Sequence, residues 1–143
     1  MEKIAIGADH GGYEYKKIII KELENKGYIV KDFGTDSSES CDYPVYAKLV
    51  SNAIAKGLFD KGILICGTGI GMSITANKTR GIRAALCSDL FSAKATREHN
   101  DSNILCLGAR IIDINKAVEI TNLWLETPFS KDERHIRRIN MIE

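Results

Sequence analysis

Two short runs, ILIC at residues 63–66 and AALC at residues 84–87, are apolar at every position. A strand with one solvated face alternates apolar and polar residues, whereas a parallel strand covered by helices on both faces does not. Both runs therefore predict central strands of a parallel sheet that is covered on its two faces.

Similar runs alternate with segments of helical period along the chain. Strands are predicted at residues 3–8, 29–33, 61–66, 82–87 and 104–108. Helices are predicted at about 12–26, 43–57, 70–79, 90–98, 114–126 and 132–141. The pattern predicts one α/β domain over residues 1–143, a Rossmann-like three-layer α/β/α sandwich with a five-stranded parallel sheet and its first strand central. Ligands of such sheets bind beyond the carboxyl ends of the strands.

Composition narrows the classes of partner. The formal net charge of +1 gives no bulk attraction to nucleic acid or to membranes. The four cysteines have neither CxxC nor zinc-finger spacing, and three of them fall in or at the end of predicted strands, which indicates free thiols in a reducing compartment. Neither an apolar signal segment nor a membrane-length run is present, so a soluble, cytoplasmic protein is expected.

A glycine-rich turn follows the third predicted strand, with Gly67, Gly69 and Gly71 ahead of a predicted helix. Glycines let the backbone approach a ligand, and a helix N-terminus adds N–H groups and partial positive charge, so the turn is expected to bind an anion. Met72 stands where a dinucleotide fingerprint has glycine, and the ending of a Walker A loop is missing. A tight connection without a ligand remains an alternative.

Cys66 stands directly before this turn. A helix N-terminus stabilises a thiolate, which can abstract a proton or attack carbon. A buried structural thiol is the alternative, as is expected for Cys87 and Cys106.

Other polar residues cluster in three places, each with a structural alternative. Asp9 and His10 follow the first strand, where they could act only as a cap and a turn residue. His99 and Asn100 close the fourth helix, where they could serve its dipole and its cap. The basic residues that could grip a phosphate, or form only a solvated face, are Arg110, Arg134, His135 and Arg138.

Taken in order, several motifs span essentially the whole chain. They are GADHGG (7–12), DYP (42–44), ICGTGIGMSITANK (65–78), GIRAALC (81–87), REHNDSNIL (97–105), LGAR (107–110) and RHIRR (134–138). Together they resemble the type B ribose-5-phosphate isomerases of the ribose/galactose sugar-phosphate isomerase family. The resemblance implies an aldose–ketose isomerase of the pentose phosphate pathway that interconverts D-ribose 5-phosphate and D-ribulose 5-phosphate through a cis-enediolate, without metal or organic cofactor. Close relatives act on allose 6-phosphate or galactose 6-phosphate, so these substrates stay open.

The resemblance also implies roles for individual residues. Cys66 matches the general base, His99 matches the residue that opens the sugar ring, and Asp9 lies near the ring oxygen or hydroxyls. The amides that would hold the enediolate oxygen belong to Gly67, Thr68, Gly69, Ile70 and Gly71, of which Thr68 also contacts substrate. The residues that match sugar and phosphate contacts are His10, Asn100, Arg110, Arg134 and Arg138; His135 lies in the same motif with a less defined role.

Family members are homodimers, in some cases paired into tetramers, and their active site lies between subunits. The resemblance thus implies that His99 and Cys66 of one site belong to different chains. A non-catalytic phospho-sugar or nucleotide-binding module, and a nicotinamide-dependent enzyme, are the alternatives from other classes. Met72 and the small size of the chain count against the second.

Overall fold

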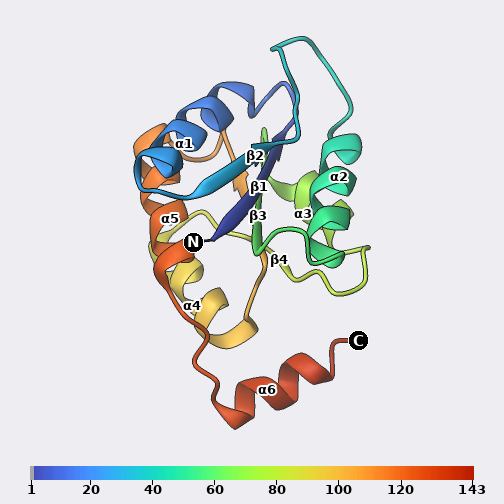
Figure 1. Cartoon of the computed structure of the whole chain (residues 1–143), viewed down its shortest axis with the longest axis vertical. Coiled ribbons are helices and arrows are strands. Elements are labelled where there is room, and N and C mark those ends of the chain that lie inside the picture. The colour runs from blue at the N-terminus through green and yellow to red at the C-terminus, as the bar shows by residue number, and fades with distance from the viewer. Residues whose placement is uncertain (1) are drawn as a thin grey trace.

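The computed structural model describes residues 2–143, in which strands and helices alternate up to the last strand (Figure 1). In chain order the elements are β1 (Lys3–Ala8), α1 (Tyr13–Asn25), β2 (Ile29–Asp32), α2 (Tyr43–Ala55), β3 (Lys61–Cys66), α3 (Ile70–Ala76), β4 (Ala84–Leu86), α4 (Leu90–Asn100), β5 (Ile104–Gly108), α5 (Ile114–Glu126) and α6 (Glu133–Asn140). The predicted five-stranded α/β sandwich is confirmed, and most of the predicted bounds lie within a few residues of the observed ones.

All five strands are parallel, in the order β2-β1-β3-β5-β4. The ILIC run lies in the middle strand, β3, as predicted. The prediction that AALC is central is wrong, because β4 is an edge strand of three residues. Ala84 and Ala85 are only partly buried and Leu86 is exposed, so the apolar run at β4 does not mark a strand covered on both faces. The first strand, expected to be central, lies inside the sheet between β2 and β3 and leaves the middle position to β3.

The outer edge of β4 is covered by a side chain rather than by a strand. The Asn77 amide accepts from Ala84 N at 2.8 Å and donates to Ala84 O at 3.0 Å. It thereby occupies the backbone groups that a further strand would use, which is one way in which natural sheets blunt an open edge.

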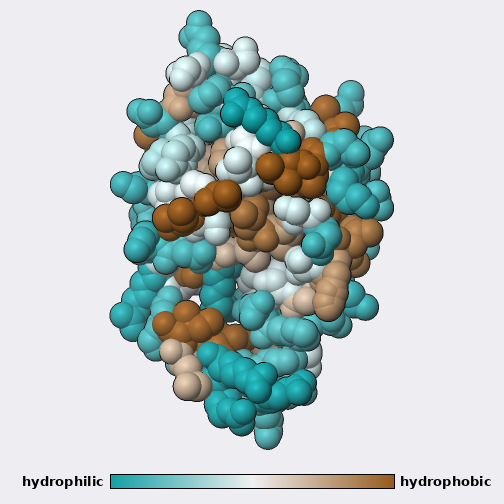
Figure 2. Space-filling view, turned by 180° about the vertical axis from the view of Figure 1, so that it is seen from behind, coloured by the Kyte–Doolittle hydropathy of each residue, from teal (hydrophilic) through white to brown (hydrophobic). Residues whose placement is uncertain are grey.

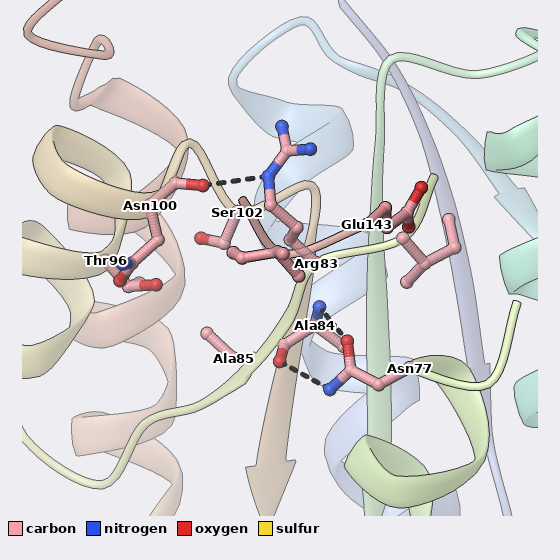
Figure 3. A pocket seen from close by; sticks show the side chains of 10 residues that line it. Asn77, Arg83, Ala84, Ala85, Thr96, Asn100, Ser102 and Glu143 are labelled. Carbon is pink, nitrogen blue, oxygen red and sulfur yellow. Dashed lines mark hydrogen bonds between the residues drawn. The ribbon is translucent and has the colours of Figure 1, made fainter. Parts of the chain in front are cut away.

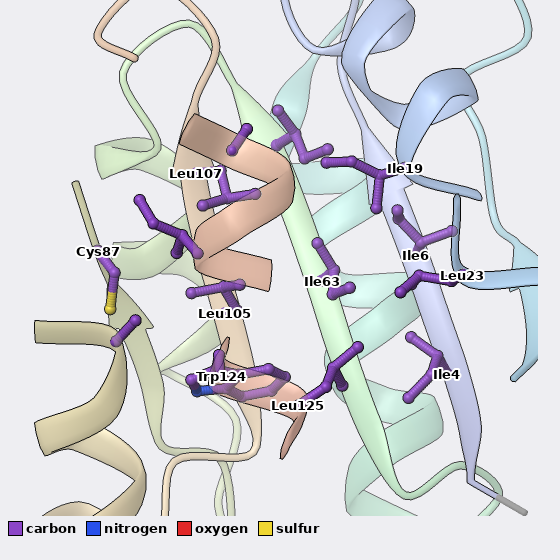
Figure 4. Close-up of a cluster of buried hydrophobic side chains, with 14 of the residues drawn as sticks. Ile4, Ile6, Ile19, Leu23, Ile63, Cys87, Leu105, Leu107, Trp124 and Leu125 are labelled. Atoms are coloured by element: carbon purple, nitrogen blue, oxygen red, sulfur yellow. The ribbon is translucent and has the colours of Figure 1, made fainter. Parts of the chain in front are cut away.

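Successive residues of β3 point to opposite faces of the sheet and define two core layers. Ile63 and Ile65 pack with the layer of α1, α4 and α5, which includes the fully buried Trp124 (Figure 4). Leu64 and Cys66 pack with the layer of α2 and α3. All four cysteines are free thiols, and Cys41 is the only one of them that is not buried. Within residues 2–143, no helix has both the length and the apolar character that crossing a membrane requires.

Aspartate caps fix where the last three helices begin. Asp89, Asp113 and Asp132 each accept from a backbone amide in the first turn of α4, α5 and α6, respectively. Because α4 starts beyond the carboxyl end of β4, it runs back along the sheet and ends near the amino end of β5. Helix α6 then contacts α4 and lies beyond the body of the sandwich (Figure 1).

Candidate active site

Three turns meet at the side of the sheet where the strands have their carboxyl ends, here called the carboxyl edge. We call these turns the glycine-loop cluster (Asp9, His10, residues 66–71 and Arg110). The turn after β1 is tied to β3, because Asp9 N donates to Ile65 O at 3.2 Å. The turn after β5 is tied to the glycine loop, because Ala109 N and Arg110 N donate to the carbonyls of Cys66 and Gly67 at 2.9 Å each. Residues far apart in sequence therefore form one surface around the end of β3.

Asp9 shapes its own turn. It is buried, and its Oδ1 accepts from the backbone amides of Gly11 at 2.8 Å and Gly12 at 3.2 Å. The N-cap of α1 is Gly12, which has no side-chain cap, so Asp9 is not the helix cap that the sequence allowed; it holds the turn ahead of the helix. The recorded bonds use only one carboxylate oxygen, so this structural role is compatible with a second role at the adjoining surface.

Cys66 is 5 % exposed, and its sulfur accepts from the backbone amide of Gly69 at 3.1 Å. Gly69 has a φ of +79°, and a Cβ there would lie 2.9 Å from the carbonyl carbon of Leu107. Glycine therefore permits the backbone to aim this amide at the sulfur. Gly69 N is therefore a fixed hydrogen-bond donor to the Cys66 sulfur.

The glycine loop leaves amide donors beside this sulfur. Within residues 2–143, no protein acceptor is recorded for the amides of Gly67 and Thr68, while Ile70 N donates to Thr68 Oγ1 at 3.2 Å. Of the five amides predicted to face an oxyanion, those of Gly69 and Ile70 are thus engaged inside the loop. Among the described residues, no acceptor is found for the amides of Gly67, Thr68 and Gly71, which are the donors available to an anion.

Cationic or titratable side chains flank the loop on two sides. His10 is half-buried, and its Nδ1 accepts from Cys41 N at 3.2 Å, which leaves Nε2 as the other ring nitrogen. Arg110 is exposed and lies over Gly67, where an added Cβ would be 3.1 Å from the guanidinium Nη1. Both side chains are positioned to meet an anionic group at the cluster.

Tyr43 is a neighbour of this cluster that the sequence did not single out. A Cβ on Gly71 would lie 2.5 Å from Cε1 of the Tyr43 ring, so the ring covers the start of α3. The side chain remains 39 % exposed. The signal for it was the DYP motif, to which no chemical role could be attached from sequence.

A second group of predicted residues lies on α4 and α6, and we call it the histidine cluster (His99, Asn100, His135 and Arg138). These residues line a pocket of about 360 Å³ together with Ile139 and Ile142. The rings of His99 and His135 lie 4.5 Å apart, centroid to centroid, and His135 is buried. Arg134, predicted to converge with Arg138, does not line this pocket and instead lies 3.7 Å from the Asp132 carboxylate.

The two clusters lie at opposite edges of the sheet. Cys66 ends β3, whereas α4 ends near the beginning of β3, where Gly62 N donates to Asn103 O at 2.9 Å. A six-residue strand rises ~3.3 Å per residue, which separates the two edges by roughly 17 Å. Within one chain, Cys66 and His99 are therefore not brought together. Arg110, proposed to join Arg134 and Arg138, also lies at the other edge.

The remaining buried thiols differ from Cys66 in their surroundings. Burial, with a smaller contribution from Asp89, raises the pKa of Cys87 to about 12. Burial also raises the pKa of Cys106, which lies on β5 in the core. Both are neutral thiols near pH 7, consistent with the structural role expected for them.

Two arginines that carried no role in the sequence analysis support the histidine cluster. Arg83 donates from Nε to Asn100 O at 2.9 Å at the edge of a neighbouring pocket (Figure 3). Arg97 is 6 % exposed and lies inside the same turn of α4. Both lie within the motifs GIRAALC and REHNDSNIL, but the backbone carbonyls that they bind, at Asn100, Ser102 and Thr127, cannot be inferred from the sequence.

The order and spacing of these turns match a family model described as ribose/galactose isomerase, over residues 4–142. The chain belongs to this family. Its class is thus that of the sugar-phosphate aldose–ketose isomerases, as the motifs predicted. It is 47 % identical to ribose-5-phosphate isomerase B of Escherichia coli (strain K12), over 99 % of this chain and 95 % of the relative.

Two further relatives show how far the likeness extends. A solved structure of Clostridium thermocellum ribose-5-phosphate isomerase B has a TM-score of 0.96 and 48 % identity, covering 98 % of this chain and 94 % of that chain. A protein of Pectobacterium atrosepticum named D-erythrulose-4-phosphate isomerase is 45 % identical, over 90 % of this chain and 86 % of the relative.

Proposed function

We propose that this chain interconverts D-ribose 5-phosphate and D-ribulose 5-phosphate in the cytoplasm, with Cys66 as the general base. The observation that carries the proposal is the Cys66 sulfur held by the Gly69 amide, next to the unengaged amides of Gly67 and Thr68. Proton abstraction from a carbon next to a carbonyl needs a base and a stabiliser of the resulting oxyanion within reach of each other. This arrangement supplies both.

The reaction starts from the open-chain aldose. The Cys66 thiolate takes the proton from C2, and negative charge develops on O1. The amides of Gly67 and Thr68 donate to that oxygen in the cis-enediolate. The hydroxyl proton on O2 then passes to O1, and the Cys66 thiol returns its proton to C1, which leaves the ketone at C2. A positioned base contributes typically ~10²–10⁴-fold, and one oxyanion donor about 3 kcal/mol.

The rest of the substrate is assigned to the flanking residues. His10 and Arg110 lie beside the glycine loop and are proposed to contact sugar and phosphate, with Arg134 and Arg138 supplying further phosphate contacts. His99, assisted by Asp9, is proposed to open the furanose ring, and Asn100 to bind the sugar. Fixing the phosphate holds C1 and C2 beside Cys66, which removes much of the entropic cost of the reaction.

A homodimer is part of this proposal, because the two clusters of one chain lie at opposite edges of the sheet. A second copy that brings its histidine cluster to the glycine-loop cluster of the first completes the site, and two-fold symmetry would build two such sites. Large hydrophobic side chains exposed near these regions are available for such an interface, among them Ile70, Leu86 and Phe91. Hydrophobic patches interrupt the polar surface seen in Figure 2. Two dimers could pair into a tetramer.

Solvent exchange tests the proposed reaction. Incubation of ribose 5-phosphate with the protein in deuterium oxide should incorporate deuterium at C1 of the ribulose 5-phosphate formed. Cys66→Ala should abolish both exchange and turnover while phosphate-ester binding persists. Cys87→Ala is the matched control, a buried thiol outside the cluster, and should keep turnover. Full activity of Cys66→Ala would refute the assignment of the base, and binding without any exchange by the wild type would favour a non-catalytic module.

Substrate length is a separate question, because the Pectobacterium relative is named for a four-carbon sugar phosphate at an identity close to that of the Escherichia coli relative. Allose 6-phosphate and galactose 6-phosphate are the six-carbon alternatives. Comparing kcat/KM on phosphates of four-, five- and six-carbon sugars decides between them. The proposal expects the highest value on ribose 5-phosphate.

A further inference from the structure

Arg97 is a buried charged residue that lies two positions before His99. Its guanidinium has three acceptors: Nε donates to Thr127 O at 3.1 Å, and Nη1 donates to Asp101 Oδ1 at 2.9 Å and also to Ser102 O. It lies 5.9 Å from the Trp124 ring, whose Nε1 donates to Ser102 Oγ at 2.9 Å. A buried arginine with such a set of partners is fixed in one position.

The first consequence concerns the turn that carries His99. Helix α4 ends at Asn100, and its C-cap residue Asp101 has a φ of +46°, a conformation that residues other than glycine rarely adopt. Arg97 binds the carboxylate of Asp101 from inside, while Arg83 donates from Nη2 to its carbonyl at 2.9 Å (Figure 3 shows Arg83 beside this turn). The two guanidiniums together hold the end of α4 in its left-handed turn.

The second consequence concerns the ring that lies against His99. Thr127, whose carbonyl Arg97 holds, begins the segment 127–132 that leads into α6. Further along this segment, Ser130 N donates to Glu98 O at 3.3 Å, and Ser130 Oγ bonds His135 Nδ1 at 3.0 Å. His135 in turn packs its ring on His99. Arg97 therefore anchors both the backbone that carries His99 and the segment that places the neighbouring ring.

We propose that Arg97 is a positioning residue for the ring-opening step, acting through His99. The inference rests on the proposed function and assigns Arg97 no contact with substrate. A lysine at this position keeps the charge but cannot hold three acceptors with one planar fork. Loss of the guanidinium fork in Arg97→Lys should let the His99 imidazole move from its position. A misplacement of ~1 Å, even when caused by a mutation far from the reacting atoms, can cost ~10²-fold in rate.

Sugar chemistry separates this role from proton abstraction. Ribose 5-phosphate closes a furanose ring through O4, so the aldose must be opened before C2 can be deprotonated. Ribulose 5-phosphate cannot close a five-membered ring, because the O5 that would close it carries the phosphate. Exchange of a C1 hydrogen of ribulose 5-phosphate with solvent therefore needs only the base and the oxyanion donors. Net conversion also needs the ring to open or close.

The experiment measures both quantities on intact, folded protein. Arg97→Lys should lower net conversion of ribose 5-phosphate about 10- to 100-fold, while deuterium incorporation at C1 of ribulose 5-phosphate stays within about threefold of wild type. Asp101→Asn, which keeps a residue tolerant of the left-handed turn, should shift the same ratio in the same direction by less. The control is Arg80→Lys, whose side chain is 89 % exposed and which should change neither quantity.

The outcomes separate the inference from the function beneath it. Unchanged net conversion in folded Arg97→Lys and Asp101→Asn proteins would overturn the inference. Equal losses of conversion and exchange would also overturn it, because Arg97 would then act on the whole site rather than on ring opening. If Arg97→Lys fails to fold, Asp101→Asn alone decides by the same ratio. Wild-type protein that shows neither conversion nor exchange refutes the proposed function itself, and the inference falls with it.

Discussion

Replacing Gly12 by alanine should separate the turn after β1 from the end of β3. Gly12 has a φ of −106°, so alanine meets no conformational barrier and the effect is purely steric. Its methyl carbon would lie 2.7 Å from both the carbonyl carbon and the Cγ2 of Ile65 and closer still to the carbonyl oxygen. Ile65 belongs to the middle strand and immediately precedes Cys66, so the strand cannot yield without moving the proposed base.

The magnitude follows from these distances. Ordinary contacts of a Cβ begin near 3.4 Å, so the turn must withdraw by at least about 0.7 Å. Asp9 and His10 move with it, away from Cys66 and Gly67. Overpacking of this kind costs about 1–3 kcal/mol of stability, which corresponds to a loss of roughly 3–10 °C in Tm. Because displacements near 1 Å can cost ~10²-fold in rate, we expect kcat/KM to fall about 10- to 100-fold.

Thermal unfolding followed by circular dichroism, together with isomerisation kinetics on ribose 5-phosphate, measures both effects. Gly27→Ala is the control: Gly27 has a φ of +94° and no atom within 4 Å of an added Cβ. It should lose about 1–2 kcal/mol through the left-handed backbone alone and keep its kcat/KM. A folded Gly12→Ala protein with wild-type kinetics would refute the reasoning, because the turn would then not position the site.

Three further predictions concern other parts of the chain. Lys16→Met should lower the free energy of unfolding, measured by urea denaturation, by about 1–3 kcal/mol. The reason is that the buried Lys16 ammonium binds the Asp32 carboxylate at 2.7 Å and the backbone carbonyl of Thr35. An unchanged free energy would mean that the ion pair makes no net contribution. In the folded protein near pH 8, iodoacetamide should leave Cys87 and Cys106 unmodified, since burial raises the pKa of both thiols, and mass spectrometry that finds them alkylated as fast as in urea would contradict this. The backbone N–H of Arg134 lowers the pKa of Asp132 below its ordinary 3.8. This carboxylate should therefore stabilise α6 above that pH and lose its contribution as the pH falls through the lowered pKa. A difference in urea stability between wild type and Asp132→Ala that persists in strong acid would show the sign to be wrong.

The sandwich and the glycine-loop cluster were predictable because both follow from local pattern. The ILIC run indicated a strand covered on both faces, and the rule that ligands bind beyond strand ends placed Asp9, Cys66 and Arg110 at one edge. The edge position of β4 was not predictable in the same way. Its apolar residues are only partly buried or exposed, and the Asn77 side chain bonds the backbone of Ala84 at the open edge, which no periodicity reveals.

The histidine cluster shows a second limit. Sequence placed His99 at the end of a helix, but only the direction of α4 relative to the parallel strands shows that this end lies at the far edge from Cys66. Arg97 was missed because its bonds to Asp101 and Ser102 depend on the shape of the turn after α4, and its bond to Thr127 reaches a distant part of the chain. Long-range hydrogen bonds of a buried side chain leave no pattern that can be read along the chain.

Mixing two inactive variants tests most directly whether one site is built from two chains. Cys66→Ala lacks the proposed base, and His99→Ala lacks the proposed ring-opening group, so each alone should show little net conversion of ribose 5-phosphate. When the two are mixed and allowed to exchange subunits, half of the dimers would carry both variants and hold one intact site. The account predicts recovery of about a quarter of wild-type activity. Mixed dimers that form, as seen by native mass spectrometry, yet recover no activity would contradict it.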